Sequence, residues 1–383
     1  MIGVILGLVT GFVPGLNSNN LSLVLIAYGF ISSNYYLAVT AIAIEISFSF
    51  FEFLSPMLFR IGNDVTSLAI NDSDFTEESF KRGINIVVTG GLLGILISLP
   101  LLFFADNIYP AVYSALKPFV GWILLFLCVY MVLIERNLKR KISATAIFCL
   151  SGLVGLLTKN SGLIASDYLL VPIFIGLYGF SSILRKKYKS VETIQDIPWK
   201  EKIRISFIAF VSSMFASLVP SMKRGQASTL ALQLGKIFKR EEVLFILPLI
   251  SLAFVTLSLF VLNSTGSIRS TLAYDINEIM GDVYISQTIL FAGTVAVSAC
   301  LSICILILIA KPIGKLFSRI NEKYIKIFGF CVCMLLIINF TGFYGILLAF
   351  TTTAIGLLSS RLGVRSTHMM GVLLLPSIVS MIL

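Results

Sequence analysis

Residues 11–29 read GFVPGLNSNNLSLVLIAYG and residues 216–235 read ASLVPSMKRGQASTLALQLG, and these two stretches decide the fold. Each interrupts an apolar segment with a proline followed by polar side chains, and a glycine comes fifteen residues after the proline. The two prolines, Pro14 and Pro220, are 206 residues apart. A repeated break of this kind indicates a duplicated membrane unit, and it is a sequence pointer to the binding site of a secondary transporter.

A second pair of stretches supports the duplication. GLLTKNSG occupies residues 155–162 and GLLSSRLG occupies residues 356–363, an offset of 201 residues that is close to the offset between the prolines. The sequence therefore predicts two related halves, residues 1–184 and residues 203–383, which are joined by the polar linker 185–202.

Composition places the chain among helical membrane proteins. Hydrophobic residues make up 57% of the chain, charged residues make up 13%, and the mean hydropathy is +0.97, far from the averages of soluble domains. The apolar stretches are continuous and mostly reach the roughly 20 residues that a helix needs to cross a bilayer. The predicted fold class is an all-α, multi-pass protein of the cytoplasmic membrane.

The net charge of +10 does not indicate nucleic-acid binding, because the basic residues cluster at the ends of apolar segments. Lysines and arginines within 136–141, 185–189 and 311–326 mark cytoplasmic loops, and the linker 185–202 is among them. The single histidine, His368, has no second metal ligand near it in the sequence. We therefore expect no metal site and no cofactor other than a coupling ion, Na⁺ or H⁺.

The charge pattern fits the apolar segments only if each half opens with a re-entrant hairpin. A single crossing at 203–235 would place the basic loop 311–326 outside, so 203–235 must enter and leave on one side. By the same logic 2–31 is a hairpin that opens outward. One hairpin and five spans per half, an odd number, make the halves inverted repeats and place both termini outside. The predicted spans are 36–59, 84–105, 119–134, 144–158 and 163–184, then 242–262, 284–310, 324–341, 343–359 and 366–383.

The proline-containing turns form the predicted substrate site. Inverted symmetry brings both turns near the membrane midplane, where helix N-termini offer N–H groups and positive dipole ends to an anion. Arg224 can hold a carboxylate or phosphate with two hydrogen bonds, and Lys223 adds charge. The alternative is that 2–31 is one kinked span and that Lys223 and Arg224 are a loop charge pair. The predicted substrate-binding residues are Pro14, Gly15, Asn17, Ser18, Asn19, Asn20, Pro220, Ser221, Lys223, Arg224, Gln226 and Ser228.

Two carboxylates inside an apolar span are the predicted ion-coupling residues. Glu45 and Glu52 are seven residues apart and therefore share one face of a helix. Carboxylates within membranes are typical of proton relays and cation sites. For Glu52 the alternative is a structural pair with Arg60 toward the cytoplasmic end of the span. Ser251 occupies the position equivalent to Glu45, so the predicted ion site is asymmetric.

Four stretches of the chain resemble the large membrane subunit of tripartite tricarboxylate transporters, the TctA family. They are GxxxGFVPGLN (Gly7 to Asn17), KRGINIVVTGGLLG (Lys81 to Gly94), LVPIFIGLYGFSSIL (Leu170 to Leu184) and GLLSSRLGVRSTHMMGVLLLPSI (Gly356 to Ile378). The chain is most similar to short, archaeal-type members, although its second turn has Pro-Ser where the family has Pro-Gly. The resemblance implies a permease for an organic anion, driven by a cation gradient, with the substrate at the two proline-containing turns. It also implies a small membrane subunit and a solute-binding protein as partners, and a homodimer is a further expected assembly.

Two other functions remain open at this stage. Polyprenyl-phosphate translocases also use paired re-entrant hairpins with basic residues, and their cargo would be a lipid phosphate taken from the membrane. An enzyme acting on lipid-linked substrates needs clustered acidic or histidine residues in polar loops. Loop 60–83 offers Asp64, Asp72, Asp74, Glu77 and Glu78, but these residues form no recognisable motif. The sequence therefore favours a transporter over an enzyme.

Overall fold

The structure is a computed structural model. It describes residues 1–12, 18, 34–59, 65–68, 73–75, 77–135, 137–164, 168–184, 190–192, 194–219, 222–237, 239–281, 285–317 and 322–382. The remaining residues include several predicted substrate-binding positions: Pro14, Gly15, Asn17, Asn19, Asn20, Pro220 and Ser221.

The described residues are almost entirely helical. The first half contains α1 (Ile2–Phe12), α3 (Asn34–Phe51), α4 (Leu54–Phe59), η1 (Thr66–Leu68), β1 (Ser73–Phe75), α5 (Glu77–Ser98), η2 (Leu99–Phe104), α6 (Ala105–Leu116), η3 (Lys117–Phe119), α7 (Val120–Leu133), α8 (Leu138–Ser161), α9 (Leu170–Phe174), the π-helical η4 (Ile175–Phe180) and α10 (Ser181–Ile183). The linker and the second half contain β2 (Ser190–Glu192), α11 (Trp199–Leu218), α12 (Arg224–Leu234), α13 (Arg240–Thr265), α14 (Thr271–Met280), α15 (Ile285–Phe317), α16 (Glu322–Arg361), η5 (Ser366–Met370) and α17 (Gly371–Ile382).

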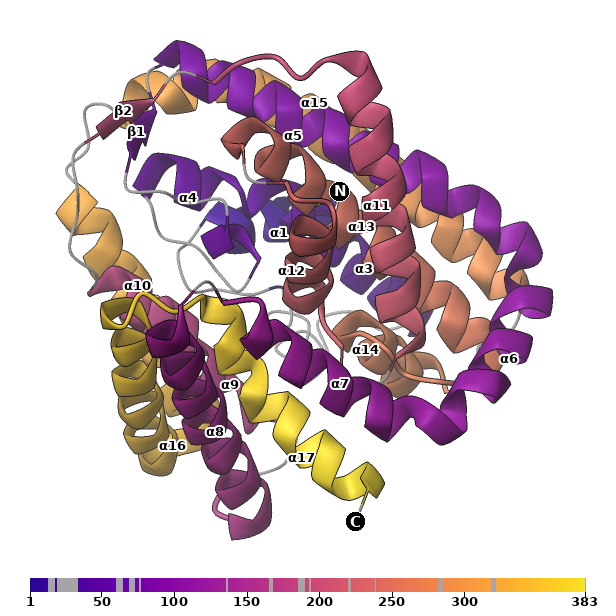
Figure 1. The fold of residues 1–383 in the computed structure, drawn as a ribbon. Coiled ribbons are helices and arrows are strands. Elements are labelled where there is room, and N and C mark those ends of the chain that lie inside the picture. The colour runs from indigo at the N-terminus through magenta and orange to yellow at the C-terminus, as the bar shows by residue number, and fades with distance from the viewer. Residues whose placement is uncertain are drawn as a thin grey trace.

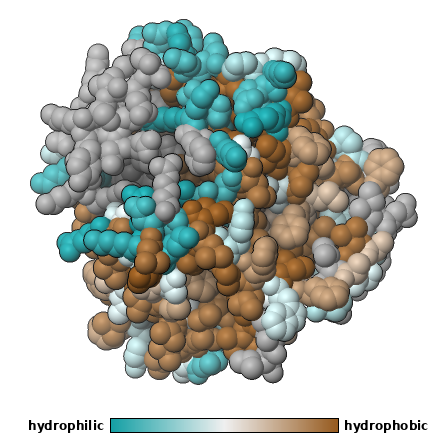
Figure 2. Space-filling model, in the orientation of Figure 1, coloured by the Kyte–Doolittle hydropathy of each residue, from teal (hydrophilic) through white to brown (hydrophobic). Residues whose placement is uncertain are grey.

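Six helices in the described part of the chain are long and apolar enough to cross a membrane. They cover Tyr35–Leu58, Glu78–Leu101, Leu138–Ser161, Arg240–Thr265, Ile289–Ile313 and Lys326–Arg361. Large apolar side chains such as Phe126, Leu308 and Leu335 are exposed, as expected for helices that face lipid. In Figure 2 the hydrophobic surface is broad, and the hydrophilic residues gather mainly toward the upper edge of this view. The predicted all-α, multi-pass membrane fold is confirmed, and the chain is an integral membrane protein.

The helices pack in two groups (Figure 1). The first group surrounds α13 and contains α1, α3, α5, α11, α12, α14 and α15. The second group contains α7, α8, α9, η4, α10, α16, η5 and α17, and most of it lies at the lower left of Figure 1. We call these the first and second bundles. Each bundle combines helices from both halves of the sequence.

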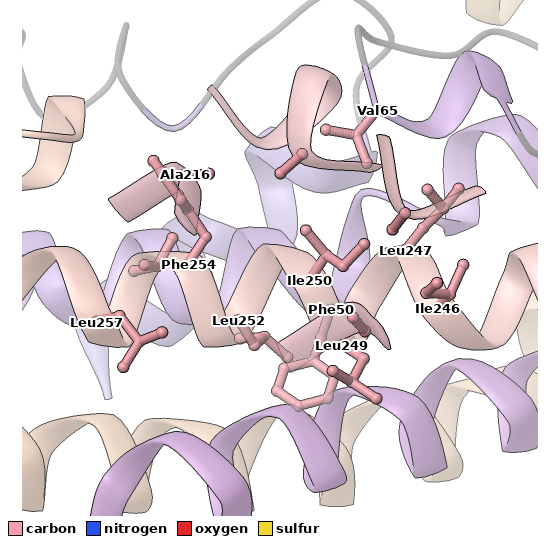
Figure 3. Packing of buried hydrophobic residues seen from close by; sticks show 14 of the residues in the cluster. Phe50, Val65, Ala216, Ile246, Leu247, Leu249, Ile250, Leu252, Phe254 and Leu257 are labelled. Atoms are coloured by element: carbon pink, nitrogen blue, oxygen red, sulfur yellow. The ribbon is translucent and has the colours of Figure 1, made fainter. Parts of the chain in front are cut away.

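The core of the first bundle is α13, which is apolar around its whole circumference. Such a helix is stable only when other helices cover every side. Figure 3 shows Ile246, Ile250 and Phe254 of α13 among buried neighbours that include Phe50 of α3 and Ala216 of α11. All of these side chains are buried.

Glycines on α5 bring its backbone close to α13. A Cβ atom on Gly90 would lie 2.2 Å from the carbonyl oxygen of Phe245, and one on Gly94 would lie 2.6 Å from that of Leu249. Small residues at helix contacts allow this close approach in membrane proteins, where packing rather than water exclusion holds helices together. The segment Lys81 to Gly94 thus has a packing role in addition to its resemblance to the family.

The helix α16 folds back on itself at Gly342. Gly342 has φ 61° and ψ −150°, a conformation that is essentially restricted to glycine. Tyr168, just before α9, stacks on Phe340, and Phe180 at the end of η4 contacts Phe330, so the part before Gly342 runs antiparallel to the segment 168–180. The part after Gly342 runs parallel to it, because Gly176 meets Ala349 and Thr352 whereas Gly356 meets Leu177 and Ser181. The break falls between the predicted spans 324–341 and 343–359.

The second predicted hairpin also has two antiparallel helices. α11 and α12 pack together, and Nη1 of Arg204 near the start of α11 donates to the carbonyl oxygen of Gly235 at the end of α12 (3.4 Å). From Arg204 to the turn, α11 rises roughly 20 Å at 1.5 Å per residue. That length reaches past the middle of a hydrocarbon core of about 30 Å.

Polar connections form small structures of their own. β1 from loop 60–83 pairs in parallel with β2 from the linker 185–202, with Asp74 opposite Val191. Arg82 Nη1 also donates to the carbonyl oxygen of Ile194 (3.3 Å), so the two connections lie together. The loop 263–283 contains α14, whose first turn is capped by the Ser270 hydroxyl accepting from the N–H of Ala273.

Candidate functional site

The start of α12 is buried inside the protein. The Oε1 atom of Gln226 accepts from the backbone N–H of Lys223 (2.7 Å), which fixes the first turn of the helix. Gln226, Ser228 and Thr229 are all buried. Free N–H groups at a helix N-terminus away from water are stable only where they are buried in protein or line a polar cavity. The sequence placed the substrate site at this turn.

Arg224, the first residue of α12, contacts two side chains of α3 and one in the turn directly after it, which we call the α3 segment. Its Nη1 atom lies 3.3 Å from Oε1 of Glu45 and 3.9 Å from Oε1 of Glu52, and it donates to Oγ of Ser49 (3.1 Å). The side chains of Arg224, Glu45 and Glu52 are 13%, 8% and 1% exposed. The structure therefore brings together the predicted anion-binding arginine and both predicted coupling carboxylates. We call Arg224, Glu45, Glu52 and Ser49 the charge cluster.

The guanidinium of Arg224 also contacts the aromatic ring of Phe48 and the hydroxyl of Ser49. Cζ of Arg224 lies 5.5 Å from the centroid of the Phe48 ring, a cation–π distance. The Ser49 hydroxyl donates to the backbone carbonyl of Glu45 (2.9 Å), so its oxygen lone pairs are left to accept from Arg224. Arg60, the alternative partner of Glu52, lies outside the described residues.

In the charge cluster one guanidinium lies within 4 Å of two carboxylates. At an effective dielectric constant of about 20, two opposite charges about 4 Å apart attract by about 4 kcal/mol. Burying an uncompensated ion costs several kcal/mol. The attraction between these side chains therefore helps to hold the start of α12 against the α3 segment.

The other predicted residues at the second turn lie in two different environments, one aromatic and one buried and polar. The Nζ atom of Lys223 lies 4.4 Å from the centroid of the Phe174 ring, which belongs to α9 in the second bundle. Among the described residues, Nε2 of Gln226 and Oγ of Ser228 are buried without a hydrogen-bond partner. Buried polar atoms are nearly always satisfied, so such atoms indicate a place for water or a ligand. From the first turn, Ser18 is described and is also buried.

Ser251 of α13, the position equivalent to Glu45, is buried as well. Its Oγ atom has no hydrogen-bond partner in the part of the chain that the structure describes. Under the predicted repeat, Glu45 and Ser251 would be equivalent, and the asymmetry of the ion site stays a prediction.

A second buried polar cluster was not anticipated from the sequence. Nε2 of His368 lies 3.2 Å from Oε1 of Glu135, and Nε of Arg365 lies 3.8 Å from the same oxygen. With the amide of Gln233 oriented toward the guanidinium, its oxygen accepts from Nη2 of Arg365 (2.8 Å). The cluster joins the end of α12 to the α7–α8 connection and to η5. One signal in the sequence could have indicated this cluster: Glu135 is an acidic residue directly before the basic stretch 136–141.

The Glu135 carboxyl group is held in its ionised form. Burial by itself would raise its pKa, but the hydrogen bond with His368 and the charges of Arg365, His368 and Arg140 outweigh this effect. The net result is a pKa below the ordinary value for glutamate. Glu135 therefore acts as a permanent negative charge at neutral pH.

Comparison with known proteins identifies the family of the chain. The family model described as "Tripartite tricarboxylate transporter TctA family" matches residues 1–371. A Methanocaldococcus jannaschii protein named Uncharacterized protein MJ1079 is 25% identical over 399 residues, covering 99% of this chain and 97% of the relative. No solved structure matches the chain.

Proposed function

The chain belongs to the tripartite tricarboxylate transporter TctA family, and from this premise we propose that it is a secondary active transporter. It moves a small organic anion such as a carboxylate across the cytoplasmic membrane by alternating access, driven by a Na⁺ or H⁺ gradient. The observation that carries the proposal is the charge cluster at the buried start of α12, where Arg224 meets Glu45 and Glu52.

Inverted repeats of residues 1–184 and 203–383 are part of the proposal, and the packing of the helices supports them. Under the offset of about 206 residues, α1, α3 and α5 correspond to α11, α13 and α15. α1 packs on α3 as α11 packs on α13, and α5 packs on α13 as α15 packs on α3. In the second bundle, α8 packs on α17 and the last part of α16 packs on η4. Equivalent elements thus exchange partners, as two-fold symmetry requires.

The proposed orientation places the basic loops inside and both termini outside. The pairing of β1 with β2 supports it. In this orientation loop 60–83, which comes one span after the outward-opening hairpin 2–31, lies on the cytoplasmic side together with the basic linker 185–202. We propose that the α11–α12 hairpin is re-entrant and that the segment 2–31 is its symmetry partner. Both turns then approach the membrane midplane from opposite sides.

The family works in tripartite systems with a small membrane subunit and a solute-binding protein. By this relationship we propose that the chain also takes its solute from a binding protein. Substrate contacts fall to the residues at the two turns, with Lys223 and Arg224 providing charge, and ion coupling falls to Glu45 and Glu52. The proposed activity is transport without a chemical step, so no catalytic residue is assigned.

The decisive experiment is a ligand screen on the purified protein followed by uptake. Thermal unfolding in detergent is measured with di- and tricarboxylates, amino acids and prenyl phosphates, and the ligands that raise the Tm are tested for uptake into proteoliposomes. We expect a carboxylate to stabilise the protein and to accumulate when a Na⁺ or H⁺ gradient is imposed. Stabilisation by prenyl phosphates alone, without carboxylate uptake, would instead show a lipid-phosphate translocase.

The orientation is tested separately by cysteine labelling in cells. Cysteines placed at positions 137 and 190 should react only with cytoplasmic reagent, and a cysteine at position 272 should react only from outside. Reaction of positions 137 and 272 from the same side would overturn the inverted-repeat arrangement.

A further inference from the structure

We propose that Arg269 forms an outer carboxylate-binding subsite, which holds the substrate anion before it reaches the start of α12. Arg269 lies in the connection between α13 and α14, and it is the only lysine or arginine between Arg240 and Lys311. In the proposed orientation this connection, which is poor in basic residues, lies outside. The inference rests on the proposed function and orientation, and it names a second contact for the same substrate.

One edge of the Arg269 guanidinium is available to a ligand. Its Nε and Nη2 atoms are buried and have no hydrogen-bond partner in the part of the chain that the structure describes. These two atoms lie on the same edge of the planar group, and we call them the donor edge. Such an edge holds a carboxylate with two parallel hydrogen bonds. Because buried polar atoms are nearly always satisfied, the donor edge indicates a place for an anion.

The face of the same guanidinium is covered by an aromatic ring. Cζ of Arg269 lies 4.7 Å from the centroid of the ring of Tyr113 on α6. Burial lowers the pKa of Arg269 from its ordinary value, and the interaction with Tyr113 opposes this change, whereas no carboxylate among the described residues contributes. A guanidinium stays charged in proteins all the same. A carboxylate on the donor edge would therefore supply the anionic partner of this charge.

The fold holds Arg269 in a fixed place. Ser270, the next residue, caps α14, and its hydroxyl lies 2.7 Å from that of Ser258 on α13. Arg269 as a whole is partly exposed, although the donor edge is buried. A ligand must therefore be enclosed by the protein to meet these donors, which favours a small anion over the surface of a partner protein.

The helix α6 connects this subsite to the second hairpin. Tyr109 lies one helical turn before Tyr113 and therefore on the same side of α6. Tyr109 is buried, and its hydroxyl faces Ser217 near the end of α11. α6 thus contacts both Arg269 and the α11 arm of the hairpin whose other arm, α12, begins at Arg224. This position suits a subsite that the substrate occupies on its way to the start of α12.

The first test needs no ligand. Arg269→Met keeps an apolar side chain against Tyr113 but removes the charge and the donor edge. Replacing buried charges with apolar side chains of similar volume is often neutral or stabilising. We therefore expect the Tm of ligand-free Arg269→Met to equal or exceed that of the parent. A Tm below that of the parent would show that Arg269 serves the fold instead, and it would overturn the proposal.

The second test measures uptake of citrate into proteoliposomes that contain no solute-binding protein. We expect the KM of Arg269→Met for external citrate to rise about tenfold while the maximal rate is kept, because one charged contact is lost. Arg269→Lys should show most of this rise, since lysine keeps the charge but not the paired donors. The control is Lys159→Met, which removes an exposed cation at the end of α8 in the second bundle and should keep the parent's KM.

Two outcomes of the uptake test would overturn the proposal. The first is an unchanged KM in both Arg269 variants. The second is a defect that appears only when uptake depends on a solute-binding protein, because it would assign the donor edge to an acidic side chain of that partner.

A last arm separates this subsite from the proposed function. If the parent takes up no citrate, thermal unfolding is compared in sodium acetate and in sodium chloride at equal ionic strength. A rise of the parent's Tm in acetate that Arg269→Met loses would support the carboxylate subsite while counting against citrate transport. Equal responses of the two proteins to acetate, whether large or absent, would overturn the subsite.

Discussion

Glu45 and Glu52 lie in a space that is nearly closed to solvent, and Arg224 contacts both. Buried charges persist only when they are paired, because the loss of solvation exceeds the attraction unless the geometry is good. Removing one member of the cluster therefore takes a charged contact away from the others. Such residues are expected to control energetics of transport more than stability of the fold.

The first prediction concerns Glu45→Gln. Glutamine keeps the shape and hydrogen-bonding capacity of the side chain but removes the charge that would hold a coupling ion. We expect exchange of substrate across proteoliposomes to persist while gradient-driven accumulation is lost. Imposing Na⁺ and H⁺ gradients separately identifies the ion. Glu278→Gln on α14 is the control, and normal accumulation by Glu45→Gln under both gradients would show that Glu45 has no coupling role.

The second prediction concerns the pH dependence of stability through Glu135. The pKa of Glu135 is lower in the folded protein than in the unfolded chain, so this residue stabilises the fold above its unfolded value of about 4.3. That stabilisation is lost as the pH falls through the lower folded pKa. Glu135→Gln should therefore be less stable than the parent at neutral pH, and the difference should shrink only below about pH 4. Thermal unfolding between pH 3 and 7 measures it, and a difference that is constant down to pH 3 would contradict the assignment.

At the scale of the elements, α12 is attached at both ends to the second bundle. Lys223 at its start contacts the ring of Phe174, and Gln233 near its end contacts Arg365. Its sides pack on α11 and α13 of the first bundle. This helix of eleven residues therefore contacts both bundles. In the proposed alternating-access mechanism, the substrate site lies between the parts that move, and α12 has such a position.

The third prediction tests the close contact between α5 and α13. In Gly90→Ala the new Cβ would lie 2.2 Å from the carbonyl oxygen of Phe245, and a backbone atom cannot move aside as a flexible side chain does. We expect destabilisation of about 1–3 kcal/mol, as for other overpacked cores. The matched control is Gly293→Ala on α15, where no atom lies within 4 Å of the new Cβ and alanine favours the helix by up to about 1 kcal/mol. Thermal unfolding of both variants should give opposite signs, and equal shifts would refute the steric explanation.

At the scale of the whole molecule, the sequence predicts what depends on local pattern. The apolar runs place α3, α13 and the two parts of α16, and the spacing of Glu45 and Glu52 predicts their common face, because these features follow from helix geometry. The contact of those carboxylates with Arg224 could not be predicted. Arg224 is far from them in sequence, and it reaches them only through the packing of α11 and α12 on the rest of the first bundle.

The same limit applies to the second polar cluster. Glu135 and His368 are 233 residues apart, and their contact depends on how α7, α8 and η5 pack in the second bundle. From the sequence, His368 could be considered only as a metal ligand, and no role was predicted for it. As a hydrogen-bond partner of Glu135 it fixes the place where the end of α12 meets the second bundle. Long-range polar contacts of this kind require the assembled fold.

The last prediction concerns movement between the two bundles. Alternating access requires one bundle to shift against the other, and the contact of Gln233 with Arg365 crosses the boundary between them. In a background without the six native cysteines, Gln233→Cys with Arg365→Cys should be joined by a short, reducible bis-thiosulfonate linker. We expect the linked protein to lose uptake into proteoliposomes and to recover it after reduction. Ser258→Cys with Ser270→Cys is the control, because these hydroxyls lie 2.7 Å apart within the first bundle and their linkage spans no moving boundary. Uptake by the linked Gln233–Arg365 pair at the rate of its reduced form would mean that the two bundles keep their relative position at this contact throughout transport.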